Sequence, residues 1–281
     1  MIAPETRMGP VHLTVSDLAR SLDFYRSALG LEVQDEDDGR AAFGAGKTEL
    51  LVLHEQPGAP PADGHTGLFH FALLLPDRAS LARFLAHAAR ERVPLQGLSD
   101  HDVSEAIYLG DPDHHGIEIY ADRPRERWEG QVMQRMTTLP LDTQSLLGEL
   151  EDPQSEPFEG LPDGTTMGHV HLRVADIPAT LAFYRDLLGF ELMAEYGDQA
   201  AFLAAGGYHH HLGANTWESR GASPPPPGSA ALRHATIVLP GQADRDRLLA
   251  LVEEAGQDVE ETDDGPLVRD PAGNGLVLAA A

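Results

Sequence analysis

Residues 9–18 read G-P-V-H-L-T-V-S-D-L, and residues 168–177 read G-H-V-H-L-R-V-A-D-I. The two stretches are offset by 159 positions, and the same offset relates the Asp-Pro turns at Asp111 and Asp270. An offset this long indicates two copies of one domain in tandem, because solenoid repeats recur about every 20–50 residues.

The repeat divides the chain of 281 residues into two domains of ordinary size. We expect an N-terminal domain at residues 8–122 and a C-terminal domain at residues 167–281. Residues 123–166 are rich in Pro, Asp and Glu, so we interpret them as a linker.

Composition excludes several classes of protein. A net charge of -25 disfavours nucleic acid as a partner, because phosphate contacts need clustered Lys and Arg. No apolar run approaches the roughly 18 residues of a membrane helix, and we see no signal peptide, so we expect a cytoplasmic protein without a membrane partner. With no cysteine but 14 histidines, the available metal ligands are His, Asp and Glu. The sequence does not decide whether the protein forms a homo-oligomer, which stays possible.

Within each copy the pattern is a strand, a helix and several further strands, and it occurs twice. Residues 11–15 alternate as a strand, Ser16 or Asp17 can cap the helix that follows, and Gly30 suits the left-handed end of that helix. A second strand begins at Leu68, followed by an Ala- and Leu-rich helix. The chain therefore reads as an α+β protein of four such modules.

Strand alternation places polar side chains opposite the apolar ones. His12, His70 and Glu118 each lie between bulky apolar neighbours on an expected strand. We expect each to face away from its apolar neighbours. A sheet that curls around that second face would bring them together.

The V-H-L-T-V-x-D-L, F-Y-x-x-x-L-G and L-F-H-F-A-L-L-L-P motifs and the segment S-E-A-I-Y-L-G-D-P-D-x-x-G-I-E-I-Y resemble the vicinal oxygen chelate superfamily. Within it, the chain is most similar to two-domain catechol 2,3-dioxygenases of the extradiol type. The resemblance implies four βαβββ modules paired into two tandem open barrels.

The resemblance also implies a metal site in the N-terminal domain. His12, His70 and Glu118 occupy the family's ligand positions, and two imidazoles with one carboxylate are the ligand set of non-haem Fe(II) oxygenases. Fe(II) is the expected metal, with Mn(II), Ni(II) or Zn(II) as alternatives. The implied substrates are a small aromatic diol and O2.

Two further residues are candidates for catalysis. Tyr108 precedes Glu118 by ten residues, as the family's substrate-binding tyrosine does. His101 is a candidate acid-base group, because an imidazole can accept and release a proton near neutral pH.

The second copy departs from the ligand pattern, because Val277 takes the place of Glu118. A second metal site remains an alternative to a vestigial cavity in this copy. Its candidate ligands are His171, His209, His211 and His234.

Two other functions stay open. If Glu49 joins the three predicted ligands, the site would have the four protein ligands of a glyoxalase-type isomerase or lyase. A resistance-type protein would use the barrel to bind a small molecule without catalysis. One fold hosts all these functions, so the fold by itself does not choose among them.

Overall fold

The computed structural model describes residues 1–155 and 157–281; residue 156, within the predicted linker, lies outside the described residues. The first half contains β1 (Arg7–Val15), α1 (Leu18–Ser27), β2 (Glu32–Asp37), β3 (Arg40–Ala45), β4 (Thr48–Glu55), β5 (Gly67–Leu74), α2 (Arg78–Glu91), β6 (Leu95–Asp100), β7 (Ser104–Gly110) and β8 (Gly116–Asp122). The connector contains a short 3-10 helix (Arg125–Arg127), α3 (Val132–Arg135), β9 (Leu139–Pro140) and α4 (Thr143–Leu147). The second half contains β10 (Thr166–Arg173), α5 (Ile177–Leu181), a π-helical turn (Ala182–Leu187), β11 (Glu191–Tyr196), β12 (Ala200–Ala204), β13 (Leu212–Asn215), β14 (Leu232–Leu239), α6 (Gln242–Glu254), β15 (Glu260–Thr262), β16 (Gly265–Arg269) and β17 (Gly275–Ala280).

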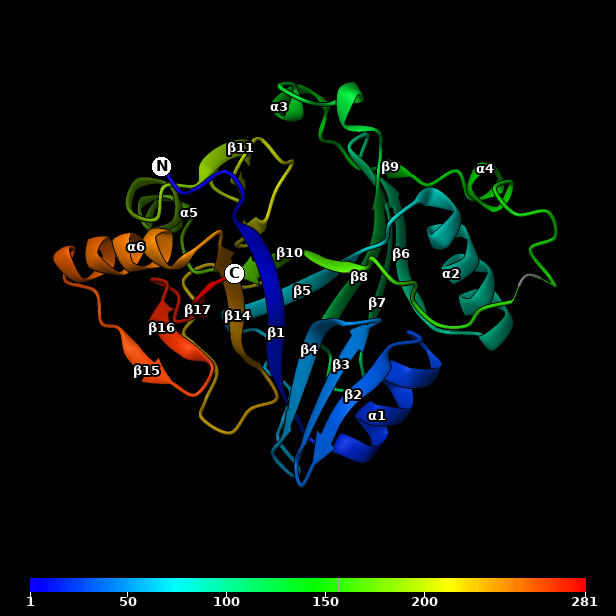
Figure 1. Cartoon of the computed structure of the whole chain (residues 1–281), viewed down its shortest axis with the longest axis horizontal. Helices are drawn as coiled ribbons and strands as arrows, with labels where there is room; N and C mark the ends of the chain where they lie inside the picture. Colours follow the sequence, from blue (N-terminus) through cyan, green and yellow to red (C-terminus); the bar gives the residue numbers. More distant parts are fainter. Residues whose placement is uncertain (156) are drawn as a thin grey trace.

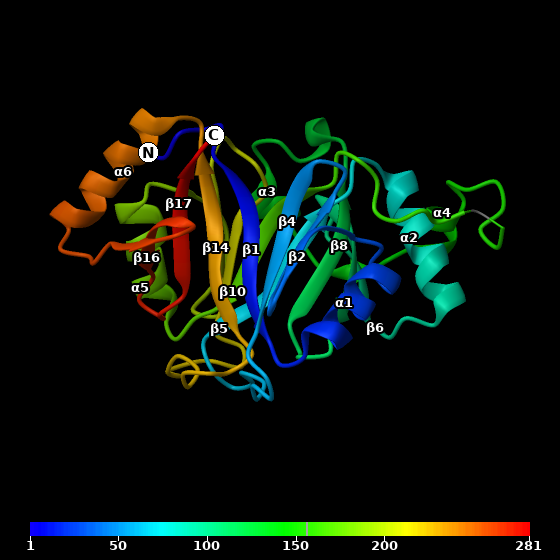
Figure 2. The ribbon, with the colours of Figure 1, turned by 60° about the horizontal axis from the view of Figure 1, so that its bottom comes forward.

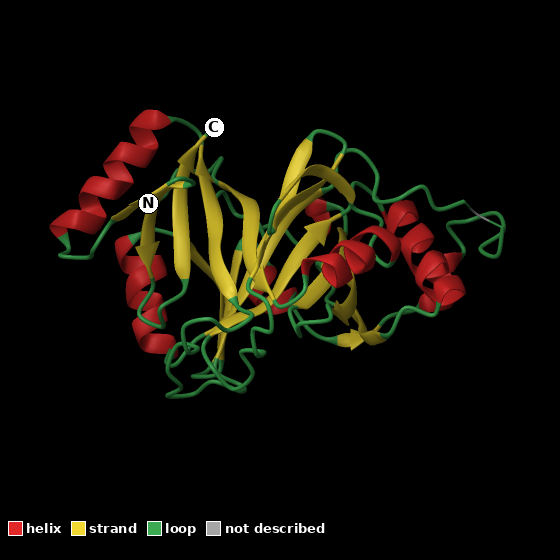
Figure 3. Ribbon diagram, turned by 90° about the horizontal axis from the view of Figure 1, so that it is seen from below, coloured by secondary structure: helices red, strands yellow, loops and turns green. Residues whose placement is uncertain are grey.

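These elements confirm the α+β class and the four βαβββ modules (Figure 1). The local signals behave as predicted at α1. The Asp17 carboxylate caps the helix by accepting a hydrogen bond from the Arg20 amide, and Gly30, three residues after the helix ends at Ser27, has a φ of 75°. The strands lie in the middle of the molecule, and the longer helices flank them on the outside (Figure 3).

The two sheets combine modules from both halves of the chain. In the part of the chain that is described, one sheet has eight strands in the order β15-β16-β17-β14-β1-β4-β3-β2. The other has nine strands in the order β11-β12-β13-β10-β5-β8-β7-β6-β9. The first module therefore pairs with the fourth and the second with the third, so each sheet is shared between the two sequence repeats. Figure 2 shows β17, β14, β1 and β4 side by side.

Strand pairing at the centre of each sheet brings histidines opposite one another. In the eight-stranded sheet, β1 and β14 run antiparallel with His12 opposite His234. In the nine-stranded sheet, β10 and β5 run antiparallel with His171 opposite His70. The repeated pairing gives each sheet its own group of histidines.

Each half also repeats a buried contact between its first helical segment and its Asp-Pro turn. The Tyr25 hydroxyl donates a hydrogen bond to the Asp111 carboxylate over 2.9 Å, and Tyr184 donates to Asp270 over 3.0 Å. All four side chains are buried.

Among the described helices, none is both long and apolar enough to cross a membrane.

Candidate metal centre

Three neighbouring strands of the nine-stranded sheet bring His70, Glu118 and His169 together. The Glu118 Oε2 atom lies 3.0 Å from His70 Nε2 and 3.2 Å from His169 Nε2. The two Nε2 atoms are 3.4 Å apart. The three side chains come from β5, β8 and β10, and all are buried.

This donor set fits a divalent metal ion. Ligand atoms about 3.0–3.5 Å apart can share one ion at bond lengths of roughly 2.0–2.2 Å. Two imidazoles and a carboxylate suit Fe, Mn, Ni or Zn better than Ca or Mg, which favour oxygen ligands. His70, Glu118 and His169 can therefore hold one transition metal ion.

The charges of this cluster also suit a metal. Burial by itself would raise the pKa of Glu118, but His169 and His70 together hold it well below its usual value, so the carboxylate stays ionised. Burial lowers the pKa of His169 from 6.5 to about 4, against the opposing effect of Glu118. His169 is therefore neutral at pH 7, which is the form that binds metals.

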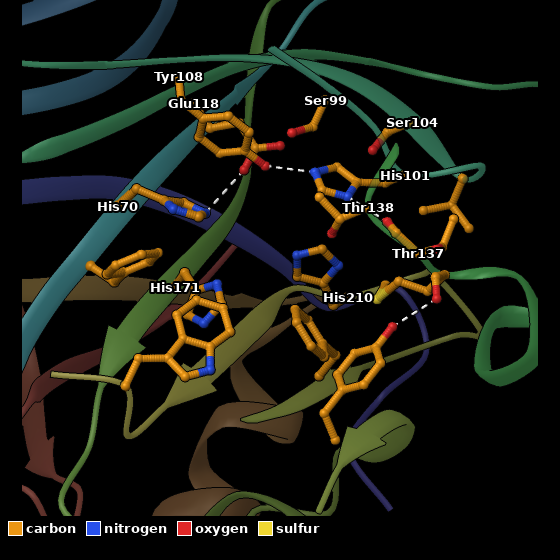
Figure 4. A pocket seen from close by; sticks show the side chains of 16 residues that line it. His70, Ser99, His101, Ser104, Tyr108, Glu118, Thr137, Thr138, His171 and His210 are labelled. Carbon is orange, nitrogen blue, oxygen red and sulfur yellow. Dashed lines mark hydrogen bonds and ion pairs between the residues drawn. The ribbon is translucent and has the colours of Figure 1, made fainter. Parts of the chain in front are cut away.

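A cavity of about 320 Å³ lies beside the cluster (Figure 4). Its polar lining includes His70, Glu118, Tyr108, His101, His171 and His210. Its apolar lining includes Phe69, Val103, Met136, Phe202 and Trp217. A concave, mainly apolar space with a few polar groups is typical of a small-molecule site.

His101 and Tyr108 form a hydrogen-bonded pair in the cavity wall. The Nε2 atom of His101 is 2.7 Å from the Tyr108 hydroxyl, and its Nδ1 atom is 2.7 Å from the carbonyl oxygen of Thr137. Because a carbonyl only accepts, Nδ1 carries a hydrogen, which leaves Nε2 of the neutral ring to accept from Tyr108. Burial, and then the charge of Glu118, raise the pKa of Tyr108 well above its usual value, so the phenol keeps its proton.

The connector forms part of the cavity wall. Met136, Thr137 and Thr138 all line it, although residues 123–166 were interpreted from sequence as a linker. The Tyr196 hydroxyl donates to the Met136 carbonyl over 2.7 Å, which ties the connector to β11. The Pro- and acid-rich composition of the connector gave no signal for this role.

The predicted grouping of His12 with His70 and Glu118 is wrong. His12 lies on β1 in the eight-stranded sheet, where it contacts His54, His234 and Asp264. His70 and Glu118 lie in the other sheet with His169. The error came from assuming that the first two modules pair with each other.

The predicted second group, His171, His209, His211 and His234, does not form either. His171 lines the main cavity, whereas His234 lies in the eight-stranded sheet opposite His12. His209 contacts the Asp122 carboxylate at 2.9 Å, and the His211 ring accepts from the Ala205 amide at 3.2 Å. His209 and His211 lie in the segment that precedes β13.

His169 is the residue that the sequence interpretation missed. It lies two positions before His171 on β10, and it aligns with Pro10 of the first copy. The signal was therefore present as a second histidine in the repeat motif of one copy only. His210, which lines the cavity, was also missed; its ring centroid is 4.0 Å from that of His169.

Comparisons with known proteins agree with the fold. The model of the Glyoxalase/Bleomycin resistance protein/Dioxygenase superfamily matches residues 7–119 and 166–278. Catechol-2,3-dioxygenase of Bacillus subtilis (strain 168) is 43% identical over 284 residues, covering 98% of each protein. Metallothiol transferase FosB of Staphylococcus epidermidis is 28% identical over 42% of this chain and 87% of its own length.

Solved structures share the architecture at low sequence identity. A protein from Bacillus subtilis superposes with a TM-score of 0.63 at 16% identity, over 98% of this chain and 85% of that one. Glyoxalase I from Zea mays superposes with a TM-score of 0.59 at 18% identity, over 98% and 92% of the two chains. At these identities the superpositions show the fold alone.

Proposed function

The chain belongs to the glyoxalase/bleomycin resistance protein/dioxygenase superfamily, and within it we propose that it is an Fe(II)-dependent extradiol dioxygenase that opens the ring of a catechol-like substrate with O2. The proposal rests on one arrangement of side chains. The cluster of His70, Glu118 and His169 borders a cavity that also holds the hydrogen-bonded pair His101–Tyr108. The catechol-2,3-dioxygenase of Bacillus subtilis, which aligns with nearly the whole chain, supports assignment to the extradiol dioxygenases.

The proposed ligands are His70, Glu118 and His169. Bound by them, Fe(II) supplies the redox chemistry between an aromatic diol and O2 that amino-acid side chains lack. Glu118 is ionised and His169 is neutral, so these two ligands contribute a single negative charge. Fe(II) held by one carboxylate would keep a net positive charge, which would favour an anionic catecholate.

In this proposal the pair His101–Tyr108 exchanges a proton with the substrate and orients it. The Tyr108 phenol stays protonated, so its hydroxyl can donate to a substrate oxygen. The Thr137 carbonyl fixes the tautomer of His101, which leaves Nε2 free to take a proton from a substrate hydroxyl and return it later. The substrate hydroxyl would replace Tyr108 as the hydrogen-bond partner of that nitrogen.

The rest of the cavity favours an uncharged aromatic ring. Phe69, Phe202 and Trp217 offer ring faces and edges for packing, and Val103 and Met136 add further apolar surface. No Lys or Arg occurs among the described residues that line the cavity. We therefore propose catechols with hydrogen or alkyl substituents as substrates, because a carboxylated ring would lack a cationic partner.

The other two functions lack a supporting observation. The isomerase hypothesis needed Glu49 as a fourth ligand, but Glu49 is exposed on β4 in the eight-stranded sheet. A purely sequestering protein would not need the buried group of two imidazoles and a carboxylate. Both hypotheses therefore rank below the dioxygenase.

Oxygen consumption tests the proposal. Protein loaded anaerobically with Fe(II) is mixed with catechol or a methyl-substituted catechol, and O2 uptake is followed together with the yellow colour of a ring-opened semialdehyde. We expect one O2 consumed for each ring opened, slower turnover of carboxyl-substituted catechols, and no turnover by Glu118→Gln. Glu36→Gln, which changes an exposed carboxylate on β2, is the matched control. Iron-loaded protein that consumes no O2 across the panel would refute the proposal.

A further inference from the structure

A second cluster of metal-competent side chains lies in the eight-stranded sheet. The Asp264 Oδ2 atom is 3.6 Å from His12 Nδ1 and 3.6 Å from His234 Nε2. The two imidazole rings face each other with centroids 4.1 Å apart. His54 lies beside the group and is hydrogen-bonded to it, with its Nε2 atom 3.3 Å from His12 Nδ1.

This cluster lies at the matching place in the other sheet but uses a different set of ligands. His12 stands opposite His234 on β1 and β14, as His171 stands opposite His70 on β10 and β5, although the first cluster uses His169 and not His171. Val277 occupies the position of Glu118 on the last strand, so that strand supplies no ligand. Asp264, in the turn between β15 and β16, brings a carboxylate to the same pair of histidines.

The spacing suits a single ion. Two ligand atoms bound tetrahedrally at about 2.1 Å lie roughly 3.4 Å apart. Both contacts of the Asp264 carboxylate are slightly longer than that, so a small inward movement of the turn would close them on an ion. They are also too long for good hydrogen bonds, so hydrogen bonding does not account for the place of Asp264 beside the two histidines.

An unpartnered buried nitrogen is a second, independent observation. His234 is only 5% exposed, and its Nε2 atom has no hydrogen-bond partner among the described residues. A buried polar atom without a partner is costly unless something absent from the protein chain satisfies it. This nitrogen points toward Asp264, whose side chain is 41% exposed and gives an ion a path from solvent.

We propose that His12, His234 and Asp264 form a second divalent-metal site, of the kind that binds Zn(II), with water completing the coordination. The site is separate from the proposed iron site and does not depend on the dioxygenase reaction. It joins β1 of the first module to β14 and the β15–β16 turn of the fourth. An ion there would hold the two ends of the chain together, and binding to the folded state alone would stabilise the fold.

Metal stoichiometry and spectroscopy test this site. Chelator-treated protein is titrated with Co(II) and separately with Zn(II), and bound metal is measured by elemental analysis. We expect two equivalents for each chain, and one equivalent for Asp264→Asn and for His234→Ala. The Co(II) absorption bands of the second site should disappear in Asp264→Asn. Asp263→Asn, which changes the exposed neighbouring carboxylate, should keep both equivalents.

Two further variants separate this proposal from the dioxygenase proposal. Glu118→Gln should lose the other equivalent and keep the Asp264-dependent one, and the double variant Glu118→Gln, Asp264→Asn should bind neither. Zn(II) should raise the melting temperature of Glu118→Gln but not that of the double variant. If wild-type protein binds a single equivalent that Glu118→Gln abolishes, or if Asp264→Asn keeps both equivalents, the second site does not exist. Circular dichroism checks that each variant is folded. If His234→Ala unfolds, Asp264→Asn still tests the site, because Asp264 is exposed.

Discussion

His101 Nε2 lies 2.7 Å from the hydroxyl oxygen of Tyr108, and the opposite nitrogen of the same ring is held by a carbonyl of the connector. The connector therefore fixes the tautomer of a side chain on the loop between β6 and β7. This contact makes the two residues a unit, and their effects on catalysis should depend on each other.

A double-mutant cycle on His101 and Tyr108 tests that dependence. We expect His101→Ala to lower kcat by about 10²–10⁴-fold, the usual contribution of an acid-base group. Tyr108→Phe should lower kcat/KM by roughly 10- to 100-fold, the value of a hydrogen bond to a charged oxygen. The double variant should be little worse than His101→Ala, and its pH–rate profile should lose the same limb. Effects that add within about 0.5 kcal/mol would mean that the two residues act independently.

The two histidines of β10 should behave differently. His169→Ala should lose one bound metal equivalent, because His169 Nε2 lies 3.2 Å from the Glu118 carboxylate. His171→Ala should keep that equivalent and raise KM, because His171 lines the cavity and packs against Phe69 and Trp217. Elemental analysis and steady-state kinetics on the same samples measure both effects. The reverse result would make His171 the ligand.

Metal-free protein should lose stability in mild acid. Burial lowers the pKa of His211 from 6.5 to about 4 and that of His12 from 6.5 to about 3, where the charges of His234 and His54 add to the effect. Below pH 6.5 the unfolded chain therefore binds protons that the folded chain does not bind until about pH 4 or lower. The free energy of unfolding falls as the pH falls through this window, by about 1.4 kcal/mol per pH unit for each such proton.

Urea unfolding at several pH values between 6.5 and 4 measures this slope. His211→Gln removes one of the titrating groups, so its slope should be shallower than that of the wild type by about one proton. His114→Gln, which makes the same replacement at a side chain that is 61% exposed, is the matched control. A wild-type midpoint that does not change over this range would contradict the expectation.

The repeated Tyr–Asp contact offers a comparison of stability within one molecule. Tyr25→Phe and Tyr184→Phe each remove a buried hydrogen bond to a carboxyl group, which is worth about 1–3 kcal/mol. We expect the larger loss for Tyr184→Phe. The second partner of Asp111 is the imidazole of His115 at 2.8 Å, which, against the effect of burial, holds the pKa of Asp111 below its usual value. The second partner of Asp270 is the uncharged amide of Asn274 at 2.9 Å, and there burial raises the pKa of the carboxyl. Urea unfolding at pH 7 measures both losses, and an equal or opposite order would show that His115 does not compensate.

Much of the candidate site was readable because strands alternate and copies can be compared. The alternation at His70 and Glu118 placed both on one face, and the structure brings them to within 3.0 Å. The resemblance to the extradiol family indicated Tyr108, and acid-base chemistry indicated His101; both line the same cavity. All four residues belong to the second module, where local geometry decides the outcome.

The sequence by itself determined the four modules, the ends of their helices and the faces of their strands, because capping, turn chemistry and alternation act over a few residues. Only the tertiary structure decided which modules share a sheet. As a result His169, and not the predicted His12, lies beside Glu118, and Asp264 lies beside His12. Partners in different modules are chosen by how whole sheets bury their apolar faces. Modules as similar as these carry nearly the same local pattern whichever pairing forms.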